Sequence, residues 1–359
     1  MKTTGKTSKG LGLTLLAAVL LLAGCGDKKG SEASESPAAT ASATSSAQPS
    51  TSAQPENPAE LQEVTLVLDW TPNTNHTGLY VAQEQGLWEK HGLKVNLILP
   101  PEAGASALVA NGKAEFGVGA QESMILAREE GLPLVSIAPI IQHNTSGFAS
   151  PVDKNVKEPK DFEGKTYGGW GSPAEQAVIE SIMNVQNADV SKVNFVNAGS
   201  ADFFTAVKKG IDFEWIFYGW TGIEAELRNE PVNMIYLTDY SKQLDYYTPL
   251  LMTNEKTIKD KPELVRAFLA GAAEGYRFAI DNPEAAADIL IQAVPELNAE
   301  LVKASQQWLS PKYQDDAPRW GEQKREVWSG YGDWLKENGL MKADLNYDEL
   351  FTTEFLPQS

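Results

Sequence analysis

The sequence predicts an α/β protein built of two lobes, and three observations support this prediction. Short apolar runs rich in β-branched residues alternate with segments of helical spacing. The alternation occurs between residues 64 and 141 and begins again after residue 150. Polar and aromatic residues follow several of the runs directly, and ligands of parallel α/β sheets bind at the carboxyl ends of the strands. We therefore expect a ligand site at these strand ends.

The first lobe begins with a buried strand at 64–68, which ends in a loop rich in Pro and Asn. The pattern then predicts helices at 78–90, 105–110 and 124–130 and strands at 93–99, 116–119 and 134–141. The helix at 105–110 is closed by Asn111 and Gly112, a common helix end.

The second lobe repeats this pattern, with predicted strands at 165–170, 193–196, 213–218 and 234–237. Its first helix, which runs to residue 184, should start with Ser172 as N-cap, Pro173 in the first turn and Glu175 completing a capping box. Two shorter helices are expected at 201–208 and up to residue 228. An extended stretch at 247–253 reads as the return to the first lobe, and helices should follow at 262–279, 283–293, 299–309 and 322–338. We expect lobe 1 to comprise 61–145 and 250–359, and lobe 2 to comprise 146–249.

The first sixty residues are predicted to be a targeting signal followed by a tether. Lysines followed by an apolar run make residues 1–24 a secretory signal, and the run is too short to span a bilayer. The sequence LAGC that ends at Cys25 matches the bacterial lipobox, which implies lipidation of Cys25 and cleavage before it. Only Ser, Thr, Ala, Pro and Gln occur from Ser36 to Pro55, so residues 25–60 should form a disordered tether. The predicted location is the outer face of the bacterial cytoplasmic membrane.

Composition excludes several classes of function. With 30 basic and 48 acidic residues and a net charge of −18, the chain is a poor partner for nucleic acid. Its single cysteine rules out an internal disulfide and any cysteine-based metal cluster. Three scattered histidines suggest no metal site, and no metalloprotease, nucleophile-elbow, Walker or dinucleotide-binding motif occurs. We therefore expect neither a metal, a cofactor nor catalytic residues.

The residues at the predicted strand ends suit a flat heteroaromatic ligand. Aromatic faces for stacking are offered by Trp70, Trp170, Tyr218 and Trp220, although any one of them could instead pack in the core. A ligand edge that carries an amine beside a ring nitrogen can form hydrogen bonds with carboxylates or side-chain amides. The candidates are Asp69, Gln121, Glu122, Asn144, Glu175 and Glu224. Glu175 could serve only its capping box. Asn75 and His76 complete the predicted ligand-binding set, in a loop where Asn often bonds its own backbone.

Five longer blocks carry a resemblance to a known family. They read LDWTPNTNHTGLY at 68–80, QHNTSGFA at 142–149, YGGWGSPAE at 167–175, WIFYGW at 215–220 and WLSPKYQDD at 308–316. These blocks resemble the formylaminopyrimidine-binding family, the solute-binding lipoproteins of bacterial ABC importers for thiamin pyrimidine precursors. The resemblance extends from residue 64 to 357, and riboflavin-binding relatives share much of the first block.

The resemblance implies the type II periplasmic-binding fold, in which two α/β lobes joined by two crossover strands close on a ligand. It implies capture of a pyrimidine such as N-formyl-4-amino-5-aminomethyl-2-methylpyrimidine, followed by delivery to an ABC permease and its ATPase. Hydroxymethylpyrimidine, thiamin and riboflavin stay open as ligands. The alternative from another class is a pyrimidine synthase, since fungal synthases share the fold, but those enzymes carry a cysteine-rich iron motif that this chain lacks.

Overall fold

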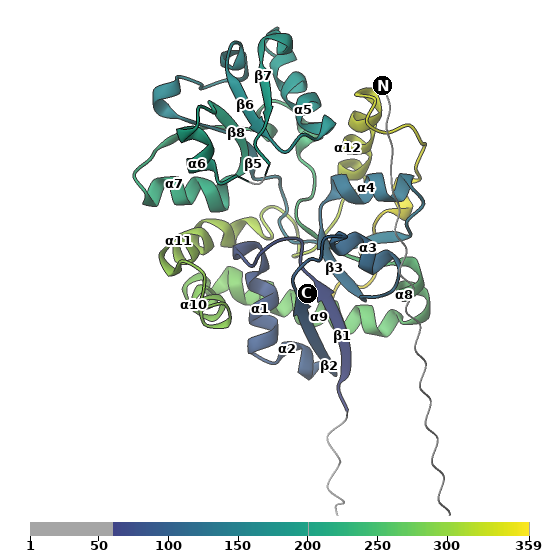
Figure 1. The fold of residues 1–359 in the computed structure, drawn as a ribbon. Helices are drawn as coiled ribbons and strands as arrows, with labels where there is room; N and C mark the ends of the chain where they lie inside the picture. The colour runs from purple at the N-terminus through teal and green to yellow at the C-terminus, as the bar shows by residue number, and fades with distance from the viewer. Residues whose placement is uncertain (1–59, 200, 359) are drawn as a thin grey trace, which may run out of the picture. The chain divides into compact units, whose positions relative to one another are not determined.

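The computed structural model describes residues 60–199 and 201–358, which contain two five-stranded sheets (Figure 1). The first sheet has the order β2 (Leu93–Ile98), β1 (Gln62–Val67), β3 (Phe116–Gly119), β10 (Leu250–Asn254) and β4 (Leu134–Pro139). The second has the order β7 (Asn194–Asn197), β6 (Thr166–Gly169), β8 (Phe213–Phe217), β5 (Ser146–Pro151) and β9 (Val232–Tyr236). Signal, lipobox and most of the tether lie outside the described residues.

The chain passes between the sheets twice. β5 directly follows β4 in the sequence but joins the second sheet, where it runs antiparallel to β8 and β9. β10 follows β9 but joins the first sheet, antiparallel to β3 and β4. The other pairs, β1 with β2 and β3, and β6 with β7 and β8, are parallel. We propose that the lobe boundaries lie at these two passages, near residues 145 and 250.

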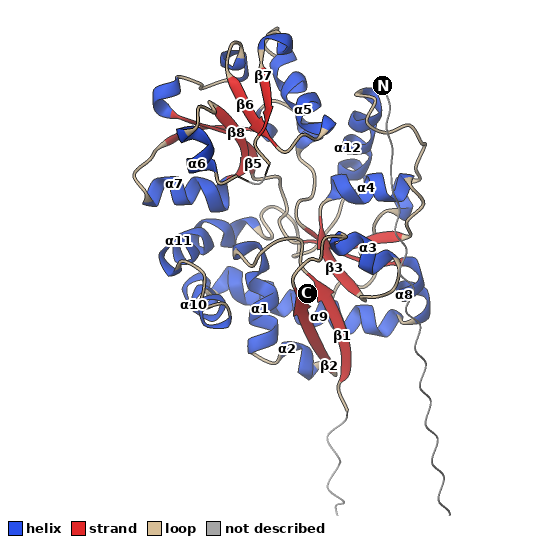
Figure 2. Ribbon diagram, viewed as in Figure 1, coloured by secondary structure: helices blue, strands red, loops and turns tan. Residues whose placement is uncertain are grey.

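Twelve α-helices cover these sheets within the described ranges (Figure 2). They are α1 (Thr77–Glu84), α2 (Leu87–Lys90), α3 (Gly104–Ala110), α4 (Gln121–Glu129), α5 (Pro173–Asn184), α6 (Phe203–Lys208), α7 (Ile223–Leu227), α8 (Glu255–Asp260), α9 (Pro262–Asp281), α10 (Pro283–Ala293), α11 (Ala299–Leu309) and α12 (Arg325–Glu337).

Most predicted elements occur, and four of the predictions need correction. The single helix predicted at 78–90 is two helices, because Gly86 adopts a φ of 62° and breaks it. α4 begins at Gln121 rather than residue 124, so Gln121 and Glu122 lie in its first turn. The strand β5 and the helix α8 were not predicted. The capping box of Ser172 and Glu175 is confirmed.

The first sheet is backed by α9, which lies beside α1 (Figure 1). Phe268 of α9 stacks on Phe116 of β3 with ring centroids 3.7 Å apart, and its carbonyl accepts a 2.9 Å hydrogen bond from the Trp88 indole. α9 approaches α1 so closely at Gly275 that a side-chain carbon there would lie 2.0 Å from the Gly78 carbonyl oxygen. The backing of this sheet therefore depends on a glycine contact between two helices.

Two of the carboxyl-terminal helices, α11 and α12, also contact residues that belong with the second sheet. Trp334 of α12 donates a 2.9 Å hydrogen bond to the Ser181 hydroxyl of α5. Ser305 of α11 donates to the Gly219 carbonyl, and Trp308 lies 5.3 Å from the Tyr218 ring. No helix within residues 60–199 and 201–358 is long and apolar enough to cross a membrane.

Candidate functional site

The predicted site residues lie at corresponding strand ends of the two sheets. In the first sheet, Val67 of β1 pairs with Gly117 of β3, so Trp70 and the start of α4 follow neighbouring strand ends. In the second sheet, Ser146 pairs with Phe217, which places the segment before β5 beside the residues that follow β8. These are the edges at which parallel α/β sheets bind ligands.

Two tryptophans at these edges are largely exposed. Trp70 follows β1 and is 60% exposed, and Trp170 follows β6 and is 52% exposed. The Trp170 ring lies 5.6 Å from that of Trp215, whose indole donates a 2.9 Å hydrogen bond to the Ser146 hydroxyl. Large aromatic rings left in water cost free energy that a stacked ligand would recover. Sequence reasoning did not point to Trp215 as the support of Trp170.

Tyr218 and Trp220 make protein contacts instead. The Tyr218 ring packs against Trp308 and Tyr236, with centroid distances of 5.3 and 5.8 Å, and its hydroxyl donates to Glu226. Burial and this carboxylate raise the pKa of Tyr218. Trp220 packs against the core of the first sheet. Their part in ligand stacking stays a prediction.

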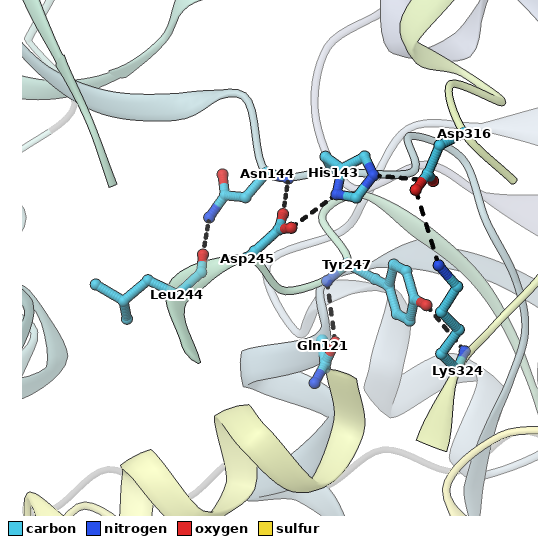
Figure 3. Close-up of polar contacts among 8 residues, drawn as sticks. All are labelled: Gln121, His143, Asn144, Leu244, Asp245, Tyr247, Asp316 and Lys324. Carbon is cyan, nitrogen blue, oxygen red and sulfur yellow. Dashed lines mark hydrogen bonds and ion pairs between the residues drawn. The ribbon is translucent and has the colours of Figure 1, made fainter. Parts of the chain in front are cut away.

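Gln121 and Asn144 each use their polar side-chain atoms inside the protein (Figure 3). Gln121 donates to the Val327 carbonyl at 3.1 Å and accepts from the Tyr247 amide at 2.9 Å. Asn144 donates to the Leu244 carbonyl at 2.9 Å and accepts from the Ser146 amide and hydroxyl at 2.9 and 2.7 Å. Both amides join parts of the chain that are distant in the sequence.

Glu175 and Glu224 are also paired. The buried Glu175 accepts hydrogen bonds from the Tyr167 hydroxyl at 2.7 Å, the Trp170 amide at 3.0 Å and the Ser172 amide at 2.7 Å. Glu224 forms an ion pair with Arg228 one turn further along α7, with a 2.9 Å bond from the guanidinium Nε. Neither carboxylate is left free for a ligand without rearrangement.

Asp69, Asn75 and His76 hold the loop that carries Trp70. The buried His76 contacts the Asp69 carboxylate at 2.7 Å through Nε2, and its Nδ1 accepts from the Asn73 amide at 3.2 Å. The carbonyl of Asn75 accepts a 2.8 Å hydrogen bond from the Tyr276 hydroxyl. These contacts support the loop, and direct ligand contact by the three residues stays a prediction.

Glu122 differs from the other acidic candidates. Its carboxylate is partly buried in the first turn of α4 and has no cation beside it within residues 60–199 and 201–358. Burial and the charge of Glu175 raise its pKa, and the nearby Tyr331 hydroxyl acts in the opposite direction. The Tyr331 hydroxyl is buried, and the Glu122 carboxylate is an acceptor beside it.

His143 links the two passages of the chain between the sheets, a role that sequence reasoning missed (Figure 3). Its Nδ1 lies 2.7 Å from Asp245 and its Nε2 lies 3.1 Å from Asp316, which in turn lies 4.0 Å from Lys324. The bond to Asp245 is the main cause that raises the pKa of His143 to about 9. His143, Asp315 and Asp316 offer atoms within 4.8 Å of one another, but both ring nitrogens already face carboxylates. The group is best described as an ion-pair cluster.

Stability should therefore depend on the charge of His143. Because its pKa is raised on folding, the stabilisation is complete below the unfolded value of about 6.5 and is lost as the pH rises through about 9. Solvent screens this half-exposed group, so we expect the effect to be about 1 kcal/mol. Urea unfolding at pH 6 and pH 10 should show a smaller loss of stability with pH in His143→Gln than in the wild type.

The control for this experiment is His91→Gln, since His91 pairs with Glu274 at the surface, away from the two passages. The His91→Gln variant should lose as much stability between pH 6 and pH 10 as the wild type does. An unchanged pH dependence in His143→Gln would show that the cluster does not stabilise the fold.

Three relatives are similar to this protein over most of its length. The formylaminopyrimidine-binding protein of Halalkalibacterium halodurans is 24% identical over 82% of this chain and 90% of its own length. A 4-amino-5-hydroxymethyl-2-methylpyrimidine phosphate synthase of Legionella pneumophila is 23% identical over 82% and 93%. The riboflavin-binding protein RibY of Chloroflexus aurantiacus is 25% identical over 83% and 87%.

The fold is shared with periplasmic binding proteins. The periplasmic aliphatic sulphonate binding protein SsuA of Escherichia coli superimposes with a TM-score of 0.65 at 14% identity, over 83% of this chain and 94% of that one. This similarity establishes the type II periplasmic-binding fold that the family resemblance implied. The model of the family described as NMT1/THI5 like matches residues 73–286, more than half of the chain. The protein is a member of the NMT1/THI5-like family.

Proposed function

We propose that the protein is the extracytoplasmic solute-binding component of an ABC importer and captures an aminopyrimidine precursor of thiamin. The observation that carries this proposal is the pair of exposed tryptophans, Trp70 and Trp170, which lie within three residues of the carboxyl ends of strands in different sheets. A flat heteroaromatic ring can stack on such faces, which gives roughly 0.5–1.5 kcal/mol per contact beyond the burial of apolar area. The ligand would then pass to the permease, and the ATPase would drive import.

The names of the relatives support the pyrimidine ligand. The Halalkalibacterium halodurans relative is named for binding formylaminopyrimidine, and the fold is that of periplasmic binding proteins. N-formyl-4-amino-5-aminomethyl-2-methylpyrimidine is therefore the ligand that we propose. The name of RibY makes riboflavin the alternative ligand.

The names of other relatives raise the alternative of a pyrimidine phosphate synthase. The sequence resemblance argues against it, since the cysteine-rich iron motif of the fungal synthases has no counterpart in a chain with one cysteine. That cysteine, Cys25, is the predicted site of lipidation.

Calorimetric titration tests the proposal. The protein without its signal should be unfolded and refolded to remove any ligand that was purified with it. It should then be titrated with formylaminopyrimidine, hydroxymethylpyrimidine, thiamin and riboflavin. The proposal predicts the tightest binding for one of the two aminopyrimidine precursors. Tightest binding of riboflavin would favour the alternative ligand, and a pyrimidine phosphate formed by the protein itself would favour the synthase.

The proposed lipid anchor makes a separate prediction. Cys25→Ser removes the thiol that the lipobox presents for acylation, so the protein should be released in soluble form or keep its signal. Separation in a detergent that forms two phases should place the wild type in the detergent phase, because an acyl chain contributes about 0.8 kcal/mol per buried methylene. A wild-type protein in the aqueous phase would contradict the anchor.

A further inference from the structure

The ring of Trp170, to which the proposed function gives a stacking face of the second sheet, rests on a second tryptophan. The main-chain N–H of Trp170 donates to Glu175 at 3.0 Å, which fixes the backbone. The ring itself is 52% exposed and lies against that of Trp215, with a centroid distance of 5.6 Å and an interplanar angle of 43°. The orientation of the exposed ring therefore depends on the orientation of Trp215.

Trp215 is in turn oriented by a chain of hydrogen bonds. It lies in β8, and its ring also packs on Phe148 of β5, 5.6 Å away. Its indole N–H donates to the Ser146 hydroxyl at 2.9 Å, and this hydroxyl donates to the side-chain oxygen of Asn144 at 2.7 Å. Because a hydroxyl has one proton to donate, the bond to Asn144 leaves the oxygen lone pairs for the indole. Each donor in the chain thus meets an acceptor.

The chain ends on a group that is itself fixed (Figure 3). The side-chain amide of Asn144 donates to the Leu244 carbonyl at 2.9 Å, and its main-chain N–H donates to the Asp245 carboxylate at 2.9 Å. Asp245 also contacts His143 at 2.7 Å, so both passages of the chain between the sheets hold Asn144. Ser146 is 0% exposed and Asn144 is 4% exposed, so little water competes for these bonds.

Resting on the proposed function, we infer that Ser146 and Trp215 are positioning residues that hold the Trp170 ring in the orientation in which it stacks on the ligand. Neither residue needs to touch the ligand. A ring that is free to turn has to be ordered when the ligand binds, and ordering one large side chain costs about two- to tenfold in affinity.

A double-mutant cycle, measured by calorimetry with formylaminopyrimidine, tests this inference. Ser146→Ala removes the hydroxyl but keeps the main-chain N–H that bonds Asn144 at 2.9 Å, and it should weaken binding by about two- to tenfold. In a Trp170→Ala background the same substitution should leave the affinity unchanged, because no ring is left to position. Trp215→Phe keeps an aromatic ring but lacks the indole N–H, so it should weaken binding to a similar extent.

Ser181→Ala is the matched control. The Ser181 hydroxyl accepts a hydrogen bond from the Trp334 indole at 2.9 Å, the same distance as at Ser146, but it lies toward the end of α5 that is far from Trp170. Its removal should leave the affinity unchanged. Thermal unfolding without ligand checks that each variant is folded.

A second measurement needs no ligand. Two indole rings that lie 5.6 Å apart and are tilted by 43° couple their transitions, which gives paired bands of opposite sign in circular dichroism. The difference between the wild type and Trp170→Phe isolates the bands of this pair. The same difference, measured in the Ser146→Ala background, should be weaker, and in the Ser181→Ala background it should be unchanged. A lower stability alone would not alter these bands in a folded protein.

The outcomes separate this inference from the proposed function. An equal loss of affinity from Ser146→Ala with and without Trp170, or unchanged bands, would show that the inference is wrong and leave the proposed function intact. If the wild type binds none of the four ligands named above, the proposed function fails. Weaker bands in Ser146→Ala would then still support the positioning of the ring, and unchanged bands would overturn it. Should Ser146→Ala not fold, Trp215→Phe with and without Trp170 completes the cycle.

Discussion

Trp70→Ala is expected to weaken binding of formylaminopyrimidine by about fivefold to about 150-fold, which corresponds to about 1–3 kcal/mol. The Trp70 ring is 60% exposed in the protein without ligand, so its removal takes away a face for stacking and little internal packing. The melting temperature of the protein without ligand should change by no more than a degree or two. Calorimetric titration gives the affinity, and a thermal scan gives the stability.

Two further variants control this result. Trp70→Phe keeps an aromatic face and should retain most of the affinity. Val185→Ala removes an apolar side chain that is 58% exposed at the end of α5, and it should leave binding unchanged. Parallel losses of stability and affinity in Trp70→Ala would place Trp70 in the core and remove the main support for the proposed site.

Gly275→Ala is expected to lower the free energy of unfolding by about 3 kcal/mol, the upper part of the usual range for overpacking. A side-chain carbon at this position would lie 2.0 Å from the Gly78 carbonyl oxygen and 3.1 Å from Ala82. The nearest atom belongs to the backbone of α1, so no side chain can rotate away and the two helices must separate. Urea unfolding should show the change as a lower midpoint.

Gly330→Ala is the matched substitution in another helix. Gly330 lies inside α12, and an added side-chain carbon would meet no atom within 4 Å. Alanine there should raise stability by about 0.5–1 kcal/mol, because glycine loses more backbone entropy on folding. If both substitutions lowered stability alike, the contact between α1 and α9 would not be the cause.

Elements with local start signals were predicted with correct bounds. The helices α10 (Pro283–Ala293) and α11 (Ala299–Leu309) span the predicted residues, and their signals are a proline in the first turn and the N-cap Asn298. The strand β5 was missed because its residues, Ser, Gly, Phe, Ala, Ser and Pro, have mostly low strand propensity. It is a strand because β8 and β9 pair with it on either side.

The sequence by itself determined the α/β class, the resemblance to a family and the candidate residues, since periodicity, helix caps and short motifs are read within a few neighbouring positions. The predicted lipobox at Cys25 is likewise a motif of a few neighbouring residues. Only the tertiary structure showed which of the polar candidates already have hydrogen-bond partners inside the protein. Asn144 bonds Leu244, and Gln121 bonds Val327, across separations of 100 and 206 residues. Hydrogen bonds are satisfied by whatever groups the fold brings close, so no local pattern could show that the side chains of Asn144 and Gln121 are already bonded inside the protein.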